Sequence, residues 1–475
     1  MQDLVQDFDV VIGLEIHAEL NTATKVFCTC KNEFGCEPNT NTCPVCTGMP
    51  GGLPILNKKA VEYTIKAGLC FGCDINDYAV FDRKNYFYPD LPSAYQISQL
   101  DYPLCLHGGV TLSNGKFVRL NRIHLEEDAG KLIHLGKDEG TLVDYNRGGT
   151  GLIEMVTEPD ISSAEEAVEL LKKMREALIF EGIALCKMEE GGMRCDTNIS
   201  LKPRGSKEFG TRTEMKNINS FKSVARAIEY EVNRQAKVLR AGGEIFQETR
   251  KWDDEKGKNF VMRTKEQAQD YRYFPDPDII PLTISKEDVE AVRKTMTMLP
   301  EDRRIRYQKE FGLPEYDAEI LTSSKYISDY FENSVALYNE PKQISNWIMV
   351  ELLKIVKGQE EFEFPISEKD LTYIIKLVDE KKINKNTGVK LLNKVIESGK
   401  EPAVIVKEEN MLATISEADI EKILQEVHDN NPKVVEDYKK DPNKVRGFII
   451  GQVMRATQGK ANNGVIVKLI PKVFD

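Results

Sequence analysis

The chain has 475 residues, of which 41% are hydrophobic and 30% charged, and its net charge is −11. This length suffices for about two to four domains, and the composition is typical of a soluble globular protein. No stretch approaches the roughly 20 apolar residues that a membrane span needs, so no membrane association is expected. The short acidic start resembles neither a secretory signal nor a transit peptide, which favours a cytoplasmic location. The net charge excludes a globally basic protein, although a local basic surface could still bind RNA.

Residues 12–20 (IGLEIHAEL) alternate between apolar and polar side chains, which predicts a strand with one buried face. Glu15, His17 and Glu19 would share the opposite face. Such a row could hold a hard cation or place acid and base groups on a rigid element. For an isolated strand a solvated polar face is the simpler interpretation, so the argument for a site depends on the pattern recurring.

The cysteines are clustered, with seven of the ten between residues 28 and 73. Without a secretion signal, thiolate metal binding is a better interpretation than disulfides. Cys28 and Cys30 are followed by Cys43 and Cys46 across a twelve-residue loop, a spacing that suits a structural, tetrahedral zinc site. Cys36 could replace one ligand, and unligated thiols are the alternative.

Residues 81–92 (FDRKNYFYPDLP) place Arg83 and Lys84 before three consecutive aromatic residues, and residues 271–277 (YRYFPDP) have a similar character. Aromatic rings can stack on a base while basic groups hold phosphate. A buried aromatic loop explains the composition slightly better.

Four further segments carry carboxylates on strand-like patterns, and five such segments in one region predict a shared acidic concave sheet. Carboxylates with a histidine suit Mg²⁺, and interleaved arginines could neutralise phosphates. This indicates ATP-dependent chemistry without a P-loop, because no G-x-x-x-x-G-K-[ST] occurs. The residues are His124, Glu126, Glu127 and Asp128 in segment 119–128, Glu154 in 151–156, Arg194, Asp196, Asn198 and Ser200 in 194–201, and Arg212, Glu214 and Lys216 in 211–217.

Helical patterns interrupt these strands and then dominate the chain. Ser162 and Glu165 have the spacing of a capping box before a helix, and a second helix is predicted over 221–241. After about residue 296, Lys/Glu-rich patterns predict small helical bundles. Residues 431–475 hold nine Lys or Arg against four acidic residues, which fits a solvated helical face or a phosphate-contact surface equally. No G-x-S-x-G or similar nucleophile motif is present, which argues against an amidase activity.

Taken together, these residues resemble the B subunit of the bacterial and organellar aspartyl/glutamyl-tRNA amidotransferase, the GatB family. The resemblance covers essentially the whole chain, and its length favours the B type over the longer archaeal E type. The matching segments are 11–20 (VIGLEIHAEL), 81–99 (FDRKNYFYPDLPSAYQISQ), 124–131 (HLEEDAGK), 152–160 (LIEMVTEPD), 188–200 (MEEGGMRCDTNIS), 214–220 (EMKNINS), 270–278 (DYRYFPDPD) and 447–463.

The resemblance implies an α+β chain with three domains. A glutamine-synthetase-like cradle with a zinc knuckle would span residues 1–295, an all-α helical domain 296–405, and a small YqeY-like helical tail domain that binds tRNA 406–475. The implied reaction is ATP-dependent phosphorylation and amidation of the side-chain carboxylate of misacylated Glu-tRNA(Gln), Asp-tRNA(Asn) or both. Ammonia would arrive through an intersubunit channel from a glutaminase (A) subunit, and a small C subunit would complete a heterotrimer.

The resemblance also assigns roles to individual residues, with ATP, Mg²⁺ and structural Zn²⁺ as the expected cofactors. Alternation cannot decide whether Glu126 or Glu127 points towards the magnesium ion, and Glu19 has a supporting role. The expected catalytic residues are Glu15, His17, Glu127, Glu154, Asp196 and Glu214. The expected magnesium ligands are Glu15, His17, Glu126, Glu127 and Glu154, and the expected ATP- or phosphate-binding residues are Arg83, Lys84, Arg194, Asn198, Arg212 and Lys216.

Two other classes of function remain open from the residues themselves. The chain could be a zinc-stabilised, non-catalytic tRNA-binding adaptor, which would not consume ATP. It could instead be a free-standing ATP-dependent ligase for a small carboxylate, which would not need the basic stretch 431–475.

Overall fold

The computed structural model divides into two compact units, residues 1–299 and 300–475. None of the helices it describes is both long and apolar enough to cross a membrane. The residues that it describes are 5–136, 139–264, 270–359, 362–409, 411–412, 416–457, 461 and 463–474.

The first unit is built on a large sheet that has ten strands among the described residues. Its central strand is β1 (Phe8–Glu19), which pairs antiparallel with β11 (Gly151–Thr157) and β12 (Met193–Pro203). On the β12 side follow β13 (Thr213–Lys216), β14 (Glu248–Asp253) and β15 (Lys258–Thr264), and on the β11 side β8 (Phe117–Glu127), β6 (Cys105–Leu106) and β2 (Asp74–Ile75), with β7 (Gly109–Thr111) also paired to β8.

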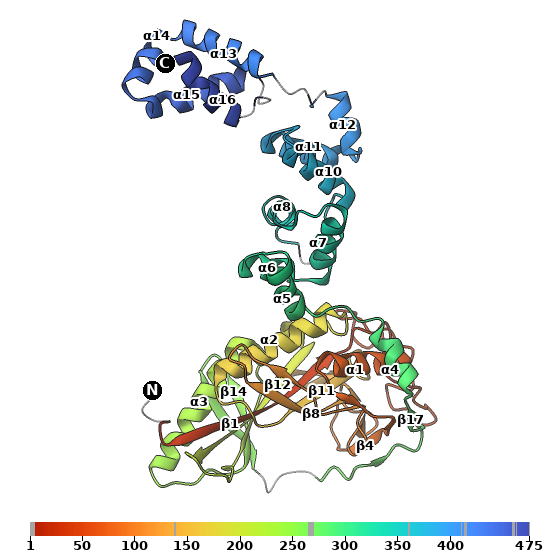
Figure 1. Cartoon of the computed structure of the whole chain (residues 1–475). Coiled ribbons are helices and arrows are strands. Elements are labelled where there is room, and N and C mark those ends of the chain that lie inside the picture. Colours follow the sequence, from red (N-terminus) through yellow and green to blue (C-terminus); the bar gives the residue numbers. More distant parts are fainter. Residues whose placement is uncertain are drawn as a thin grey trace. The chain divides into compact units, whose positions relative to one another are not determined.

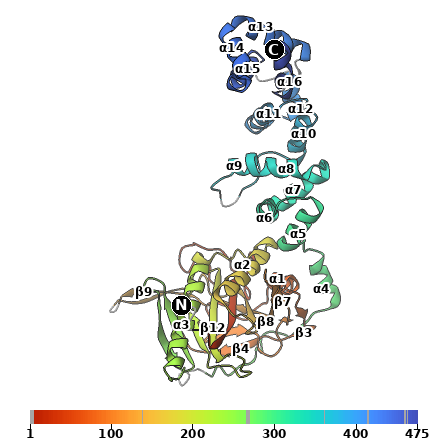
Figure 2. The same ribbon diagram turned by 60° about the vertical axis from the view of Figure 1, so that its left-hand side comes forward.

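Helices α1 (Lys58–Cys70), α2 (Ala164–Phe180) and α3 (Phe221–Arg240) pack on the sheet (Figures 1 and 2). α3 contacts β12, α1 contacts β8, and α2 contacts both helices. The apolar residues of β1, such as Ile12 and Ile16, are fully buried in the same core as the inner faces of these helices. The alternation in residues 12–20 therefore predicted the buried face of this strand correctly.

The start of α2 differs from the sequence prediction by one residue. The N-cap is Ser163, whose side chain accepts a hydrogen bond from the amide of Glu166. Ser162 lies one residue outside the helix, and its amide and hydroxyl both donate to the carboxylate of Glu166 (2.8 and 3.0 Å). Two consecutive serines offer two cap positions, and the chosen one places the apolar residues of α2 against the sheet.

Smaller sheets frame the large one. Strand β4 (Asp82–Asn85) lies between β5 (Tyr95–Ser98) and β16 (Phe274–Pro275), so that the two aromatic segments of the sequence are neighbours in space. The remaining elements of this unit are β3 (Tyr78–Ala79) paired with β17 (Leu282–Thr283), β9 (Lys131–Gly136) paired with β10 (Gly140–Asp144), the 3₁₀ helix η2 (Met188–Glu190) and α4 (Lys286–Arg293).

The described part of the second unit is helical and contains two separate hydrophobic cores. The buried residues of one core lie between Tyr307 and Val406, and those of the other between Ile420 and Phe474. The mixed α and β architecture, with one large sheet and many helices, agrees with the predicted class. The helices are α5 (Pro300–Glu310), α6 (Glu315–Leu321), α7 (Lys325–Leu337), α8 (Pro341–Trp347), the π-helix η4 (Ile348–Leu352), α9 (Leu353–Ile355), α10 (Glu368–Asp379), α11 (Lys385–Ser398), α12 (Pro402–Glu408), α13 (Glu417–Asn430), α14 (Pro432–Lys440), α15 (Pro442–Ala456) and α16 (Asn463–Phe474).

Candidate functional site

The face of the sheet opposite the helices collects the polar residues of four neighbouring strands. Directly paired residues in an antiparallel sheet point to the same side. Glu15 on β1 pairs with Asp196 on β12, and His17 pairs with Glu154 on β11, which pairs in turn with His124 on β8. The register therefore places these side chains on one surface.

The first cluster on this surface contains two histidines and two glutamates. His17 Nε2 lies 3.3 Å from Glu154 Oε2 and 3.7 Å from Glu126 Oε1. His124 Nε2 approaches the same two carboxylates at 3.4 and 3.7 Å. Ligand atoms of His17, Glu126 and Glu154 all lie within 4.8 Å of one another, which is close enough to share one metal ion.

Burial and mutual charge shift the titration of this cluster. Burial alone lowers the pKa of His124, but Glu154 and Glu126 outweigh it and raise the pKa to about 9. The pKa of His17 is also raised, because hydrogen bonding to Glu154 and the two negative charges overcome the burial effect. Burial acts to raise the pKa of Glu154, but the two histidines hold it well below its usual range. The raised pKa values of the two histidines favour imidazolium beside Glu154, and His17 would release its proton on binding a metal ion.

A second cluster, formed by Glu15, Asp196 and Glu214, lies on the same surface. Their carboxylate oxygens also lie within 4.8 Å of one another. Asn198 Nδ2 donates to Glu15 Oε1 at 2.9 Å, and Thr249 Oγ1 donates to Glu214 Oε2 at 2.7 Å. Hydrogen bonds of this kind fix the carboxylates in one orientation.

A lysine offsets part of this negative charge. Lys216 Nζ lies 2.9 Å from Glu214 Oε1 and also pairs closely with Asp196. Burial raises the pKa of Glu15, and the neighbouring charges of Glu154 and Glu214 add to that effect. Oxygen-rich clusters of this charge suit Mg²⁺, which commonly binds one or two carboxylates together with substrate phosphates.

The second cluster, together with His17 and Glu154 of the first, lines one cavity of 350 Å³. Four cationic side chains line its wall beside the carboxylates: Lys84, Arg212, Lys216 and Arg263. Lys84 Nζ lies 5.0 Å from the centre of the Tyr271 ring and 6.0 Å from that of Tyr86. The combination of clustered carboxylates and cations in one cavity could hold a metal–polyphosphate.

Three residues predicted for the site lie elsewhere, although they belong to the same strands or their ends. Arg83 is engaged by Asp276 (2.8 Å) and Asp278 (2.7 Å) and stacks on Tyr95, because alternation along β4 turns it away from Lys84. Arg194 pairs closely with Asp128 and does not line the cavity.

Glu127 is the third, and strand pairing separates it from its neighbour Glu126. Glu126 pairs with Leu152, whose side of the sheet is that of Glu154, whereas Glu127 pairs with Gly151 and points away. Glu127 Oε1 accepts the amide of Ile97 at 3.0 Å. The structure thus brings Glu126 to the histidine cluster and leaves Glu127 out of it, because strand alternation separates neighbours.

The four cysteines predicted for zinc are brought together. The Sγ atoms of Cys28, Cys30, Cys43 and Cys46 lie within 4.8 Å of one another. Cys36 is outside this group, and its Sγ lies 3.5 Å from Glu33 Oε2. Four convergent thiols fit tetrahedral zinc, with no position left for a substrate.

A buried lysine supports a thiolate interpretation of the cysteine group. Lys25 is 0% exposed, and its Nζ lies 3.5 Å from Cys46 Sγ and donates to the carbonyl of Tyr145 at 3.1 Å. A buried ammonium group needs a nearby negative charge. The Cys46 pKa falls to about 4, first because Cys28 hydrogen-bonds to its sulfur, with the charge of Lys25 contributing. Cys46 is therefore the thiolate of the group, whereas hydrogen bonding to Cys46 and burial raise the pKa of Cys28, and burial raises that of Cys30 to about 11.

Comparison with known proteins decides the family. A family model described as the GatB/GatE catalytic domain matches residues 10–290, and one described as the GatB domain matches residues 329–473. The chain is 52% identical to the B subunit of the aspartyl/glutamyl-tRNA(Asn/Gln) amidotransferase of Caldicellulosiruptor bescii, with 98% of each chain covered. It is 50% identical to the corresponding protein of Persephonella marina, covering 98% of this chain and 100% of the relative.

The chain belongs to the GatB family. The catalytic-domain match of this family includes both carboxylate clusters and the four cysteines. The family resemblance stated from the sequence motifs is therefore confirmed.

Three residues in or beside this GatB cavity were not predicted as site residues: His124 of the histidine cluster, and Thr249 and Arg263 of the cavity wall. His124 was recognised only as part of a strand, although its alternation with Glu126 already placed the two on one face. Arg263 on β15 and Thr249 on β14 contact Glu214, at 3.9 and 2.7 Å, and line the cavity. Neither has a sequence signal, because their position depends on the pairing of β14 with β13.

Proposed function

We propose that this chain is the kinase and transamidase subunit of a glutamine-dependent tRNA amidotransferase. It would activate the side-chain carboxylate of Glu-tRNA(Gln), Asp-tRNA(Asn) or both with ATP, and then amidate it. The main support is the 350 Å³ cavity, whose wall combines five candidate metal ligands with lysine and arginine side chains. The ligands are Glu15, Asp196, Glu214, His17 and Glu154. The substrate class comes from the relatives, which are subunits of aspartyl/glutamyl-tRNA amidotransferases.

The reaction proceeds by two group transfers. A substrate carboxylate oxygen attacks the γ-phosphorus of ATP, so that an acyl phosphate forms and ADP leaves. The nitrogen of ammonia then attacks the acyl carbon, the C–O bond to phosphate breaks, and the nitrogen loses a proton. The cavity must exclude water at this stage, since an acyl phosphate hydrolyses readily.

The cation clusters would hold magnesium through Glu15, Asp196 and Glu214 and through His17, Glu126 and Glu154. Bound Mg²⁺ supplies positive charge that offsets the charge of the transferring phosphate. Arg212, Lys216 and Lys84 would hold phosphate oxygens from the cavity wall. A carboxylate of the clusters would accept the proton released by the attacking ammonia.

Two observations support the proposed partners. The relatives are each one subunit of a larger enzyme. The sequence lacks the nucleophile motif of an amidase. We therefore assign glutamine hydrolysis to a separate A subunit, with ammonia passing through an intersubunit channel and a small C subunit completing the heterotrimer.

The domain assignment is part of the same proposal. A cradle over residues 1–295 would carry the chemistry, with zinc maintaining the fold near the cysteine group. The helical domain over 296–405 and the tail over 406–475 would bind tRNA. The two helical cores, within residues 307–406 and 420–474, support separate helical and tail domains.

The decisive experiment measures ATP hydrolysis by the assembled enzyme with charged tRNAs. Hydrolysis stimulated by misacylated tRNA, but not by correctly acylated tRNA, is the expected result. A zinc-stabilised adaptor would bind the tRNA without consuming ATP. A free-standing ligase would hydrolyse ATP with a small carboxylate and no tRNA, and either of these outcomes would overturn the proposal.

A further inference from the structure

Lys25 is an unusual residue of the first unit, because it is charged and yet 0% exposed. Lysine is almost never fully buried without a partner of opposite charge. Among the residues that the structure describes, no carboxylate forms an ion pair with Lys25. Its Nζ instead lies 3.5 Å from Cys46 Sγ and donates to the carbonyl oxygen of Tyr145 at 3.1 Å. The negative charge that balances this ammonium group therefore comes from the cysteine group.

The cysteine group in turn needs a cation besides the metal ion. Four thiolates carry more negative charge than one Zn²⁺ ion neutralises, and uncompensated charge is costly away from water. An ammonium group that donates to one of the sulfur atoms offsets part of this excess. Lys25 can do so without taking a ligand position, because the four sulfur atoms already converge.

The backbone of Lys25 is fixed to its surroundings on both sides. Its amide donates to the carbonyl oxygen of Cys30 at 3.0 Å, so that Lys25 contacts both cysteine pairs. Its own carbonyl oxygen accepts from Asn57 Nδ2 at 3.3 Å, and Asn57 is the N-cap of α1. These hydrogen bonds fix the position from which the side chain extends to Cys46.

The side chain of Lys25 also connects the cysteine group to the loop before β11. A Cβ at Gly149 would lie 3.5 Å from Lys25 Cδ and 3.5 Å from Cys46 Cβ, so this loop packs against both side chains. The carbonyl oxygen of Gly149 accepts from the amide of Val26 at 2.9 Å, and its amide donates to Asp128 O at 2.8 Å. Asp128 directly follows β8. The contacts therefore run from the cysteine group to the adjoining ends of β8 and β11.

We propose that Lys25 is a charge-balancing residue of the zinc site, which hydrogen-bonds to Cys46 and fastens the cysteine group to the loop at residues 145–149. Lys25 does not ligate the metal ion and strengthens zinc binding through the sulfur of Cys46. This inference rests on the zinc site of the proposed function and is independent of the reaction at the carboxylate clusters.

The test measures the zinc affinity of the full chain by competition with a chelator. Lys25→Met keeps the length of the side chain but removes its charge. It should weaken zinc binding about 10- to 100-fold, the usual loss when a group that hydrogen-bonds to a metal ligand is removed. Lys25→Gln, which is polar but uncharged, should also weaken it, and tests the loss of charge even if the apolar variant does not fold.

Lys31→Met is the matched control for the loss of a lysine near the cysteines. Lys31 directly follows Cys30, but its side chain is 65% exposed and pairs with Glu33. This variant should bind zinc as tightly as the wild type.

Cobalt in place of zinc gives a second readout, which a general effect on folding would not produce. The thiolate-to-cobalt charge-transfer band reports how strongly the sulfur atoms donate electrons. An N–H···S hydrogen bond withdraws electron density from sulfur, so its loss in Lys25→Met should move this band to longer wavelength. The band of Lys31→Met should stay at the wild-type wavelength.

The other outcomes separate errors in Lys25 from errors in the zinc site. Wild-type zinc affinity in both Lys25 variants would overturn the role of Lys25, and so would an equal loss in Lys31→Met. Weaker zinc binding with an unshifted cobalt band would overturn the hydrogen bond to Cys46. A wild-type chain that binds no zinc would instead refute the zinc site itself.

Discussion

His17 and Glu126 show how much single residues depend on the strands beside them. His17 could be assigned to the polar face from the sequence, because alternation fixes the face of every residue within a regular strand. Glu126 and Glu127 could not be separated, since both stand at the end of β8 and only the pairing of Glu126 with Leu152 decides the matter. The same holds for Arg83 and Lys84. The sequence places such residues near the site, and the strand register determines which of them face it.

The paired glutamates provide a direct test of the site. Glu126→Gln removes a candidate ligand from the histidine cluster and should lower the kcat of ATP-dependent amidation about 100-fold, as for loss of other transition-state charge stabilisation. Glu127→Gln is the matched control from the adjacent position and should retain kcat within about threefold. Both rates are measured with saturating tRNA in the assembled enzyme. A larger loss in Glu127→Gln than in Glu126→Gln would contradict the assignment of the cluster.

The role of His17 in amidation should be separable from tRNA binding. His17→Ala should abolish ATP-dependent amidation, because it removes the candidate metal ligand that lies beside Glu126 and Glu154. The Kd for tRNA should stay unchanged. Filter binding and single-turnover amidation measure the two properties. Normal turnover in this variant would exclude the cavity as the reaction site.

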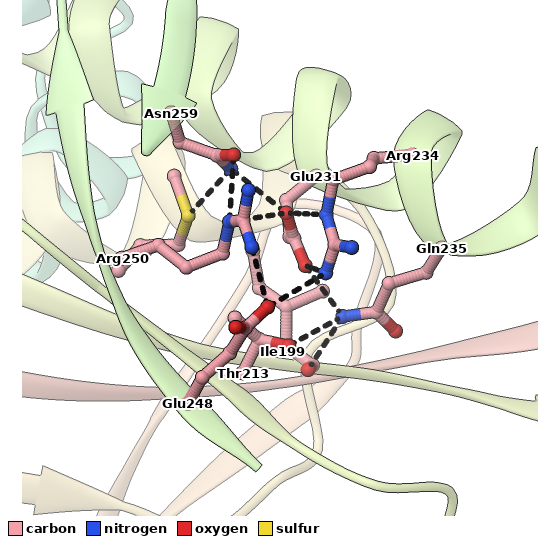
Figure 3. A network of polar contacts seen from close by, with 9 residues as sticks. Ile199, Thr213, Glu231, Arg234, Gln235, Glu248, Arg250 and Asn259 are labelled. Atoms are coloured by element: carbon pink, nitrogen blue, oxygen red, sulfur yellow. Dashed lines mark hydrogen bonds and ion pairs between the residues drawn. The ribbon is translucent and has the colours of Figure 1, made fainter. Parts of the chain in front are cut away.

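At the scale of elements, α3 is fixed to the outer strands by a buried polar network (Figure 3). Glu231 is 0% exposed and accepts hydrogen bonds from Arg234 (2.7 and 2.8 Å), Gln235 (2.9 Å) and Asn259 (2.8 Å). Asn259 belongs to β15, so the network joins this strand to α3. No sequence pattern predicted this network, because α3 and β15 are separate in the chain and its polar residues are of types that are usually exposed.

This network makes a prediction about stability and pH. Burial acts to raise the pKa of Glu231, but the hydrogen bonds and the charge of Arg234 outweigh it and lower the pKa below 4.5. A lowered folded-state pKa stabilises the protein above pH 4.5, and this stabilisation is lost as the pH falls through the folded-state pKa. Glu231→Gln should reduce the free energy of unfolding by about 3 kcal/mol at pH 7.

Urea denaturation at several pH values measures this effect. The difference between wild type and Glu231→Gln should shrink below pH 4.5. Glu290→Gln is the control, because Glu290 forms an exposed i,i+3 pair with Arg293 worth about 0.5 kcal/mol or less. A constant difference at all pH values would show that the charge of Glu231 is not responsible.

The cysteine group is a second element with a measurable role. Cys43→Ser should release bound zinc and lower Tm by about 5 °C or more, because a closed structural site contributes folding free energy. Cys36→Ser should keep both the zinc content and the Tm of the wild type. Metal analysis and thermal unfolding provide the readouts, and equal zinc content in all three proteins would refute the four-cysteine site.

At the scale of the whole molecule, the sequence predicted the class of the chain well and its internal arrangement less completely. Period-two and helical patterns are local, so they indicated a sheet-containing first part and a helical second part. The order of the strands is not local, and the neighbours of β14 and β15 could not be assigned from their sequences. The domain boundaries at residues 295 and 405 stay predictions.

The basic stretch 431–475 gives a prediction at this scale. Lys439, Lys440 and Lys444 are exposed on α14 and α15. Replacing all three by Glu should weaken tRNA binding about tenfold or more and reduce its salt dependence, because phosphate contacts are lost. Lys422→Glu, at an exposed position on α13, should have a much smaller effect. Unchanged affinity and salt dependence in the triple variant would count against a tRNA-binding tail.

Strand β1 carries the apolar core on one face and the carboxylate clusters on the other. A shift of its pairing by a single residue would expose the core and bury the clusters at once. A folding error in this strand would therefore disrupt the core and the carboxylate clusters together. For the same reason, single-residue insertions and deletions should be excluded from β1 over the course of evolution, while its ends remain free to vary in length.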